Sequence, residues 1–222
     1  MRPGLPAQGD RGEEVRTNVF LAGVGGQGIL SFARVLGELA LIRNLNVLIG
    51  ETHGMAQRGG SVTATVRYGD VYSPIIGIGK ADLLIGFEPL ESARYARILS
   101  PNGMAIVNTS RIIPYSVSAQ KTKYPDLEDL LAIIGRHCGT VIAFDATHEA
   151  EKVKFPLAAN SVMVGAAAAT MKIDAAPDDF KRAIRKVVPR KIKENLGAFD
   201  IGYDIAKKII EGHVPGPSNS KQ

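Results

Sequence analysis

The chain has 222 residues, a formal net charge of +5 and an isoelectric point near 9.3, a length that suits one α/β domain. Its single cysteine, Cys138, excludes an internal disulfide, and it excludes a metal ion or iron–sulfur cluster held by thiolates of this chain alone. No basic segment followed by an apolar core opens the sequence, which argues against a standard signal peptide and predicts a cytoplasmic protein.

The two ends of the chain differ in composition from the middle. Both are rich in Pro, Gly and polar residues, so we expect flexible tails at 1–14 and 212–222 around one domain at 15–211. The most apolar segment, 157–171, consists mostly of Ala and Gly. It is too short and too weakly apolar to cross a bilayer, so we expect a buried helix and no membrane contact.

The excess of positive charge is concentrated near the C-terminal end. Apolar residues recur at helical spacing within this cluster, which predicts an amphipathic helix with a basic outer face. The face is either solvated or a docking patch for an acidic partner. No nucleic-acid-binding motif accompanies it, so no nucleic-acid partner is predicted. The basic residues are Lys181, Arg182, Arg185, Lys186, Arg190, Lys191 and Lys193.

The first half of the chain alternates strands and helices. A strand at 15–22 runs through a glycine-rich turn into a helix at 27–43, and a second strand follows at 46–50. This order predicts a βαβ unit with a right-handed crossover. A third strand at 61–67 alternates apolar and polar residues. The turn after it predicts a hairpin that returns through residues 71–72, which would make the sheet mixed.

The second half of the chain continues the alternation and ends in helices. We expect strands at 81–87, 104–108 and 140–144, and helices at 88–98, 126–137, 158–171, 177–187 and 191–211. The first of these helices stops before a turn at 101–103. The pattern predicts a single three-layer α/β/α domain with a mostly parallel, mixed sheet and a helical C-terminal region.

The turn after the first strand has the glycine spacing of a dinucleotide-binding loop. Amides at such a helix start can hold a phosphate, because unpaired N–H groups and the helix dipole both favour an anion. Glu51 ends the second strand, where a ribose-binding carboxylate would lie. Three interpretations stay open: a phosphate site, an NAD site, or only a tight turn. The candidate ligand-binding residues of the turn are Gly23, Gly25, Gly26, Gln27 and Gly28.

A polar loop at 51–60 joins two predicted strands. It carries the carboxylate of Glu51, the imidazole of His53, the carboxamide of Gln57 and the guanidinium of Arg58 among several glycines. This combination favours a binding or catalytic loop over a connection that is merely solvated. The other histidines show no metal-ligand spacing, so no metal site is predicted.

Two further candidates follow buried strands. Glu88 and Glu91 flank Pro89, and Arg94 lies one turn beyond Glu91 on the same helical face. These carboxylates either contact a cofactor or partner, or only favour the start of a helix. Asn108 ends the strand at 104–108 and is expected to line the same crevice at the carboxyl ends of the strands.

Several of these motifs together resemble the gamma-type subunits of 2-oxoacid:ferredoxin oxidoreductases. The likeness extends over residues 18–203 and is greatest to the small, beta-type subunits of indolepyruvate ferredoxin oxidoreductases. The glycine turn at 23–28, the loop at 53–62 and the segment at 87–95 carry it, together with Asn160 and Ser161 and the segment at 194–203.

The resemblance implies an oxidative decarboxylation in which an arylpyruvate and coenzyme A give an aryl-acetyl-CoA, carbon dioxide and reduced ferredoxin. It implies that thiamine diphosphate, Mg²⁺ and [4Fe-4S] clusters reside in a large alpha subunit, with coenzyme A as co-substrate. The lone thiol and the lack of a Gly-Asp-Gly diphosphate motif agree with a chain that binds none of these cofactors tightly and is inactive alone.

The same resemblance suggests roles for the candidate residues. The glycine turn would contact a phosphate of coenzyme A, Arg58 would pair with a phosphate or carboxylate, and His53, Gln57 and Glu88 would orient substrate or partner groups. Two rival functions remain open at this point. The chain is either a free-standing NAD-dependent oxidoreductase or a non-catalytic assembly subunit.

Overall fold

The computed structural model describes residues 16–51, 59–112 and 123–212. In these residues six strands form one sheet in the order β2-β3-β1-β4-β5-β6. β1, β4, β5 and β6 run parallel, and β3 is antiparallel to both β1 and β2. The mostly parallel, mixed sheet is therefore confirmed. The strands are β1 (Thr17–Val24), β2 (Val47–Glu51), β3 (Ser61–Tyr68), β4 (Ala81–Gly86), β5 (Leu99–Asn108) and β6 (Thr140–Phe144).

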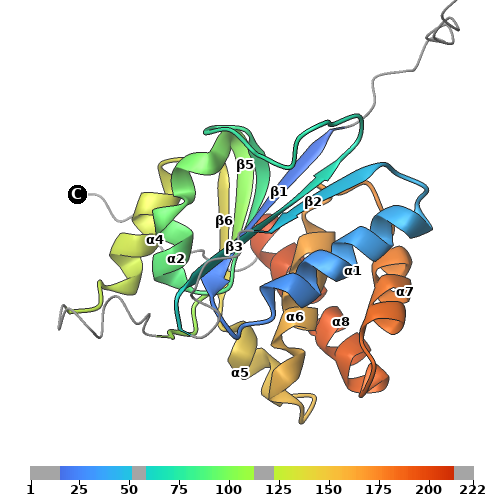
Figure 1. Ribbon diagram of the computed structural model, residues 1–222. Coiled ribbons are helices and arrows are strands. Elements are labelled where there is room, and N and C mark those ends of the chain that lie inside the picture. Colours follow the sequence, from blue (N-terminus) through green and yellow to red (C-terminus); the bar gives the residue numbers. More distant parts are fainter. Residues whose placement is uncertain (1–15, 52–58, 113–122, 213–222) are drawn as a thin grey trace, which may run out of the picture.

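Helices cover both faces of this sheet (Figure 1). One face carries α2 (Pro89–Arg94) and α4 (Leu127–Gly135). The other carries α1 (Ile29–Ile42), α6 (Ala159–Ala169), α7 (Pro177–Val187) and α8 (Ile192–Ile210). The predicted three-layer arrangement and the helical C-terminal region are confirmed. None of the described helices is long and apolar enough to cross a bilayer.

The alternation of side chains along β1 divides the core into two parts. Val19 and Leu21 join the larger cluster under α1, α6 and α8, whereas Phe20 and Ala22 join the smaller cluster under α2 and α4. All four side chains are buried because β1 lies between β3 and β4 in the middle of the sheet.

The antiparallel strand is β3 itself, so the hairpin predicted through residues 71–72 is wrong. β3 pairs with β1 from Thr17↔Tyr68 to Val24↔Ser61, and residues 69–80 form no strand. The Arg67 Nη1 atom donates to the carbonyls of Ser73 and Ile75, at 2.7 and 2.9 Å. These bonds hold the segment after β3 as a compact loop, which prevents it from returning as a strand.

The helix predicted at 88–98 is shorter than expected. α2 ends at Arg94, a 3-10 turn follows at Ala96–Ile98, and β5 already begins at Leu99. The predicted turn at 101–103 lies inside β5, where a register shift against β4 accommodates the additional residues. One short helix, α5 (Ala146–Glu151), was not predicted.

α6 and α8 cross in close contact through two glycines. A Cβ atom on Gly165 would lie 2.0 Å from the Phe199 carbonyl oxygen, and one on Gly202 would lie 1.8 Å from the Val162 carbonyl oxygen. No other residue type fits either position without separating the helices. This crossing fixes the C-terminal helices against the sheet. The prediction of one domain at 15–211 stays a prediction, and the predicted tails lie, apart from Gly212, outside the described residues.

Candidate functional site

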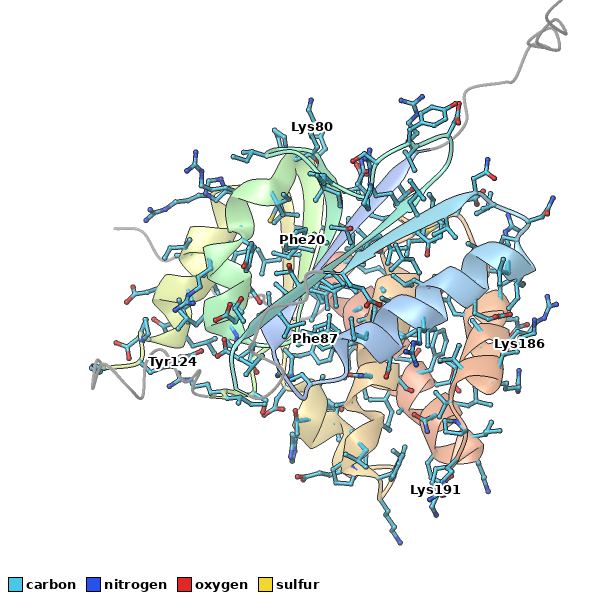
Figure 2. All side chains as sticks on the ribbon, viewed as in Figure 1. Phe20, Lys80, Phe87, Tyr124, Lys186 and Lys191 are labelled. Carbon is cyan, nitrogen blue, oxygen red and sulfur yellow. The ribbon has the colours of Figure 1, made fainter. Side chains whose placement is uncertain are left out.

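The candidate site lies at the carboxyl ends of β1 and β4, two neighbouring strands whose following helices lie on opposite faces of the sheet. β1 and β4 are parallel neighbours, paired from Val19↔Leu83 to Ala22↔Gly86. After β1 the chain enters α1 on one face, and after β4 it enters α2 on the opposite face. Strands whose following helices diverge in this way leave a crevice at their carboxyl ends, which is where α/β proteins bind ligands. Figure 2 shows Phe87 and Tyr124 at this edge, with Lys80 at the opposite edge.

The side chain of Gln27 connects the ends of the two strands. Its Oε1 accepts from the Val24 amide at 2.7 Å, and its Nε2 donates to the Phe87 carbonyl at 2.7 Å. Gly23 is buried against Gln27 and Phe87. Both ends of the Gln27 carboxamide are therefore engaged within the fold. Its predicted role as a cofactor ligand stays a prediction.

The glycines of the turn have different surroundings. Gly26 has φ 103°, is exposed, and a Cβ there would meet no atom within 4 Å. Gly28 has φ 76°, and its Cβ would lie 2.3 Å from Nδ2 of Asn160, which donates to the Gly28 carbonyl at 3.1 Å. The Gly25 amide donates to the Gly60 carbonyl at 2.8 Å. Gly26 is thus the open point of the turn, whereas Gly28 is covered by α6.

Glu88 lies on the other side of the crevice as the N-cap of α2. Glu88 is fully buried, and its Oε2 accepts a hydrogen bond from the Glu91 amide at 2.9 Å. The Tyr124 hydroxyl donates to Oε1 and accepts from the Leu90 amide at 3.2 Å. Burial raises the pKa of the Glu88 carboxyl, and the Tyr124 hydrogen bond offsets part of that rise. Glu88 therefore starts a helix, as one of the two interpretations predicts.

Glu91 is a second buried carboxylate beside Glu88. Its Oε1 forms an ion pair with Nη1 of Arg94 at 3.2 Å, as the spacing of the two residues predicts. Neither oxygen of Glu91 accepts a hydrogen bond from the residues that the structure describes. Its negative charge contributes to the raised pKa of Glu88.

Three residues near this edge were not predicted as parts of the site. Tyr124 approaches Glu88 from 36 positions along the chain, and the Arg111 guanidinium lies 5.4 Å from the Tyr124 ring centre. The Tyr95 hydroxyl lies 3.4 Å from the Ser61 hydroxyl, next to the glycine turn. A tyrosine in a connecting segment carries no periodic signal, so Tyr124 could not have been found from spacing.

Two further predicted site residues have other surroundings in the fold, and their predicted roles stay predictions. Asn108 is buried, and its Oδ1 accepts from the amides of Ala146 and Ser110, at 3.0 and 3.2 Å. Its Nδ2 donates to the Thr147 hydroxyl at 3.2 Å, so its side chain joins β5 to α5. Glu51 ends β2, which β3 separates from β1. At about 4.8 Å per strand, β2 lies about 10 Å from β1, whereas an NAD fingerprint places these strands side by side.

His53, Gln57 and Arg58 lie outside the described residues. The described end of their loop is attached to the glycine turn, because the Gly59 amide donates to the Gly25 carbonyl at 3.4 Å and Gly60 accepts from the Gly25 amide. Within the part of the chain that the structure describes, no three His, Cys, Asp or Glu side chains gather as a metal site. The predicted lack of a metal site stays a prediction.

Known proteins share the sequence pattern of this chain. The family model of pyruvate ferredoxin/flavodoxin oxidoreductase matches residues 18–205. An indolepyruvate oxidoreductase subunit IorB of Archaeoglobus fulgidus is 42% identical over 193 residues, which cover 86% of this chain and 96% of the relative.

Solved structures share the fold at lower identity. The gamma subunit of a keto/oxoacid ferredoxin oxidoreductase from Geobacter sulfurreducens aligns with a TM-score of 0.63 at 21% identity, over 86% of this chain and 98% of that one. A 2-oxoglutarate:ferredoxin oxidoreductase from Magnetococcus marinus, solved with 2-oxoglutarate, coenzyme A and succinyl-CoA, aligns with a TM-score of 0.63 at 19% identity. This chain covers 32% of that longer polypeptide and is itself covered to 88%. The resemblance found in the sequence motifs is confirmed, and the chain belongs to the pyruvate ferredoxin/flavodoxin oxidoreductase family.

Proposed function

We propose that this chain is the small subunit of an indolepyruvate ferredoxin oxidoreductase. In this role it assists the coenzyme A-dependent oxidative decarboxylation of an arylpyruvate, with ferredoxin as the electron acceptor of the assembled complex. The observation that carries the proposal is the 42% identity to an indolepyruvate oxidoreductase subunit over 96% of that relative. The proposal keeps the cytoplasmic location that the sequence predicts.

The cofactors of the reaction do not fit this chain. Cys138 is the only thiol in 222 residues, is partly buried, and donates to the Ile134 and Thr140 carbonyls at the end of α4. A [4Fe-4S] cluster needs several thiolates. The proposal therefore assigns thiamine diphosphate, Mg²⁺ and the clusters to a larger partner subunit.

The contribution of this chain is to bind and orient. The open backbone at Gly26 lets a phosphate of coenzyme A, or the partner, approach the start of α1. Arg58 supplies a cation that can pair with a phosphate or carboxylate, and His53 and Gln57 belong to the same loop. Glu88, across the crevice, retains a proton more readily than an ordinary glutamate because it is buried. Because its oxygens already accept from the Glu91 amide and the Tyr124 hydroxyl, Glu88 would orient ligand or partner groups by fixing the start of α2.

The role of the loop can be tested in the reconstituted complex. Arg58→Ala should raise the apparent KM for coenzyme A or for the 2-oxoacid, because a charge-assisted contact is lost. The matched control is Arg185→Ala, which removes the same kind of side chain from an exposed position on α7. Unchanged kinetics in Arg58→Ala would remove this residue from the site.

The two rival functions predict different results. A non-catalytic assembly subunit would restore both assembly and full activity when His53, Arg58 and Glu88 are replaced. A contributor to the site would restore assembly without full activity. A free-standing NAD enzyme would bind NAD(H) as a pure chain. The separation of β2 from β1 favours no binding in that titration.

A further inference from the structure

A cavity lies on the helical side of the glycine turn, and no residue of β1 or β4 lines it. It has a volume of about 550 Å³, which falls within the size range of small-molecule pockets. α1, the turn before α6, α6 and the connection between α7 and α8 surround it. The cavity is therefore distinct from the proposed site, and binding in it does not depend on the proposed function.

More than half of the residues that line this cavity are apolar. Phe32 and Val164 form buried parts of the lining, and Val187 lies where α7 ends. Leu157 stands at the rim with 81% of its surface exposed, although it is a large apolar side chain. A ligand with an apolar body would remove this surface from water, which stabilises the complex by about 25 cal/mol for each Å² buried.

The charged side chains of the lining are Arg34 and Arg190, and the lining contains no carboxylate. The acidic residue one turn from each of them is already paired with a lysine. Glu38 bonds Lys186 at 2.6 Å, and Glu194 bonds Lys191 at 3.0 Å. Within the described residues neither arginine has a carboxylate within 4.0 Å. Among the described residues, these two positive charges beside the cavity therefore have no direct ion-pair partner.

Four other basic side chains of this region have an ion-pair partner. Lys181 pairs with Asp200 at 2.6 Å, Arg182 pairs with Asp179 at 3.2 Å, and the labelled Lys186 and Lys191 in Figure 2 are the two lysines already described. Three of the four basic side chains of α7 are thus paired within the fold, and the fourth, Arg185, lies outside the cavity lining. The excess charge that remains beside a cavity is that of Arg34 and Arg190.

We propose that this cavity binds an amphipathic carboxylate, in which an apolar or aromatic body lies on Phe32, Val164 and Leu157 and the carboxylate pairs with Arg34 and Arg190. The guanidinium group suits a carboxylate because its N–H donors match the two oxygens. Asn160 also lines the cavity, and its side-chain Nδ2 donates to the Gly28 carbonyl. A bound ligand is therefore expected to change the environment of the Gly28 amide.

The test uses the full chain and 2-naphthylacetate as the probe, with binding followed by calorimetry and by the NMR signals of Val164, Val187 and Gly28. We expect saturable binding that weakens about tenfold in Arg34→Ala and in Arg190→Ala, since each removes one charge-assisted contact. Leu157→Ser should weaken binding as well, without affecting the fold, because this side chain is exposed. Arg185→Ala is the matched control, since Arg185 lies on α7 outside the lining, and its affinity should equal that of the wild type.

Two further probes separate the chemistry of the ligand. 2-Naphthylacetamide, which lacks the charge, and inorganic phosphate, which lacks the apolar body, should each bind at least about tenfold more weakly. Several outcomes would overturn the proposal. They are the absence of saturable binding, equal affinity for the acid and the amide, equal affinity for phosphate, or an affinity that the arginine variants do not change.

Discussion

The turns after β1 and β4 each connect the end of a strand to the start of a helix, but different side chains hold the two turns in place. After β1, a neutral carboxamide, that of Gln27, bonds both strand ends. After β4, a buried carboxylate, that of Glu88, caps the helix and takes a hydrogen bond from Tyr124. The first arrangement has no group that titrates near neutral pH, and the second has a carboxyl whose pKa burial raises. One wall of the crevice should therefore respond to pH and the other should not.

The largest loss of stability is expected from a substitution at Gly28, where the glycine turn contacts α6. Gly28→Ala should lower the free energy of unfolding by about 2 to 4 kcal/mol, because it combines a left-handed backbone with a Cβ that displaces Asn160. Gly26→Ala, which has the positive φ but open space, should cost about 1 kcal/mol. Urea denaturation of the two variants gives the comparison. Equal losses would show that Asn160 does not constrain Gly28, and Gly28→Ala combined with Asn160→Ala should recover part of the loss.

The next effect concerns the carboxamide bridge. Gln27→Ala should destabilise the fold by about 2 kcal/mol, because it leaves the Val24 amide and the Phe87 carbonyl without their partner. The loss should be the same at pH 5 and pH 8, since no titrating group takes part. Ser31→Ala, on the exposed side of α1 just after this turn, is the control and should leave stability unchanged. A loss that changes with pH would contradict the contrast between the two turns.

A smaller loss of stability is expected at the turn after β4, where Tyr124 bonds the buried Glu88 carboxylate. Tyr124→Phe should cost about 1 kcal/mol at pH 8, because the hydrogen bond to the charged Glu88 carboxylate is lost. It should also raise the pKa of Glu88 further, since this bond opposes the effect of burial. Chemical denaturation over a range of pH measures both. A cost that is larger at pH 4 than at pH 8 would show that Tyr124 does not favour the charged carboxylate.

The smallest effect is a difference in how the free energy of unfolding of the wild type and of Glu88→Gln depends on pH. Folding raises the pKa of Glu88, so its stabilising contribution is complete below about pH 4.5, the ordinary value for glutamate, and is lost as the pH rises through the folded-state pKa. Glu88→Gln cannot lose a proton. The stability of the wild type relative to this variant should therefore decrease as the pH rises above 4.5. A difference that stays constant or increases would show that the pKa of Glu88 is not raised.

The sequence predicts the parts of this fold that depend on local periodicity. The helix at 177–187 and the strand at 140–144 have the bounds expected from their apolar spacing, and the glycines at 23–28 mark the turn into α1. The pairing of β3 with β1 could not be predicted, because alternation shows that a strand exists without showing its neighbour.

The same limit applies to the site. Glu88 at the end of β4 follows from the position of a buried strand before Pro89. Its contact with Tyr124 depends on the packing of a connecting segment that has no periodic pattern. Glu51 fits the dinucleotide spacing along the chain, yet an intervening strand separates β2 from β1. Spacing along the sequence therefore gives the candidates, and the order of the strands decides which of them meet.

The most direct test of the central claim is the reduction of an acceptor dye by indolepyruvate and coenzyme A, measured for this chain alone and after mixing with a large subunit that carries thiamine diphosphate and iron–sulfur clusters. We predict no turnover by this chain alone and turnover by the mixture that exceeds that of the large subunit by itself. Sustained turnover by the isolated chain, or a large subunit that is fully active without it, would contradict the account.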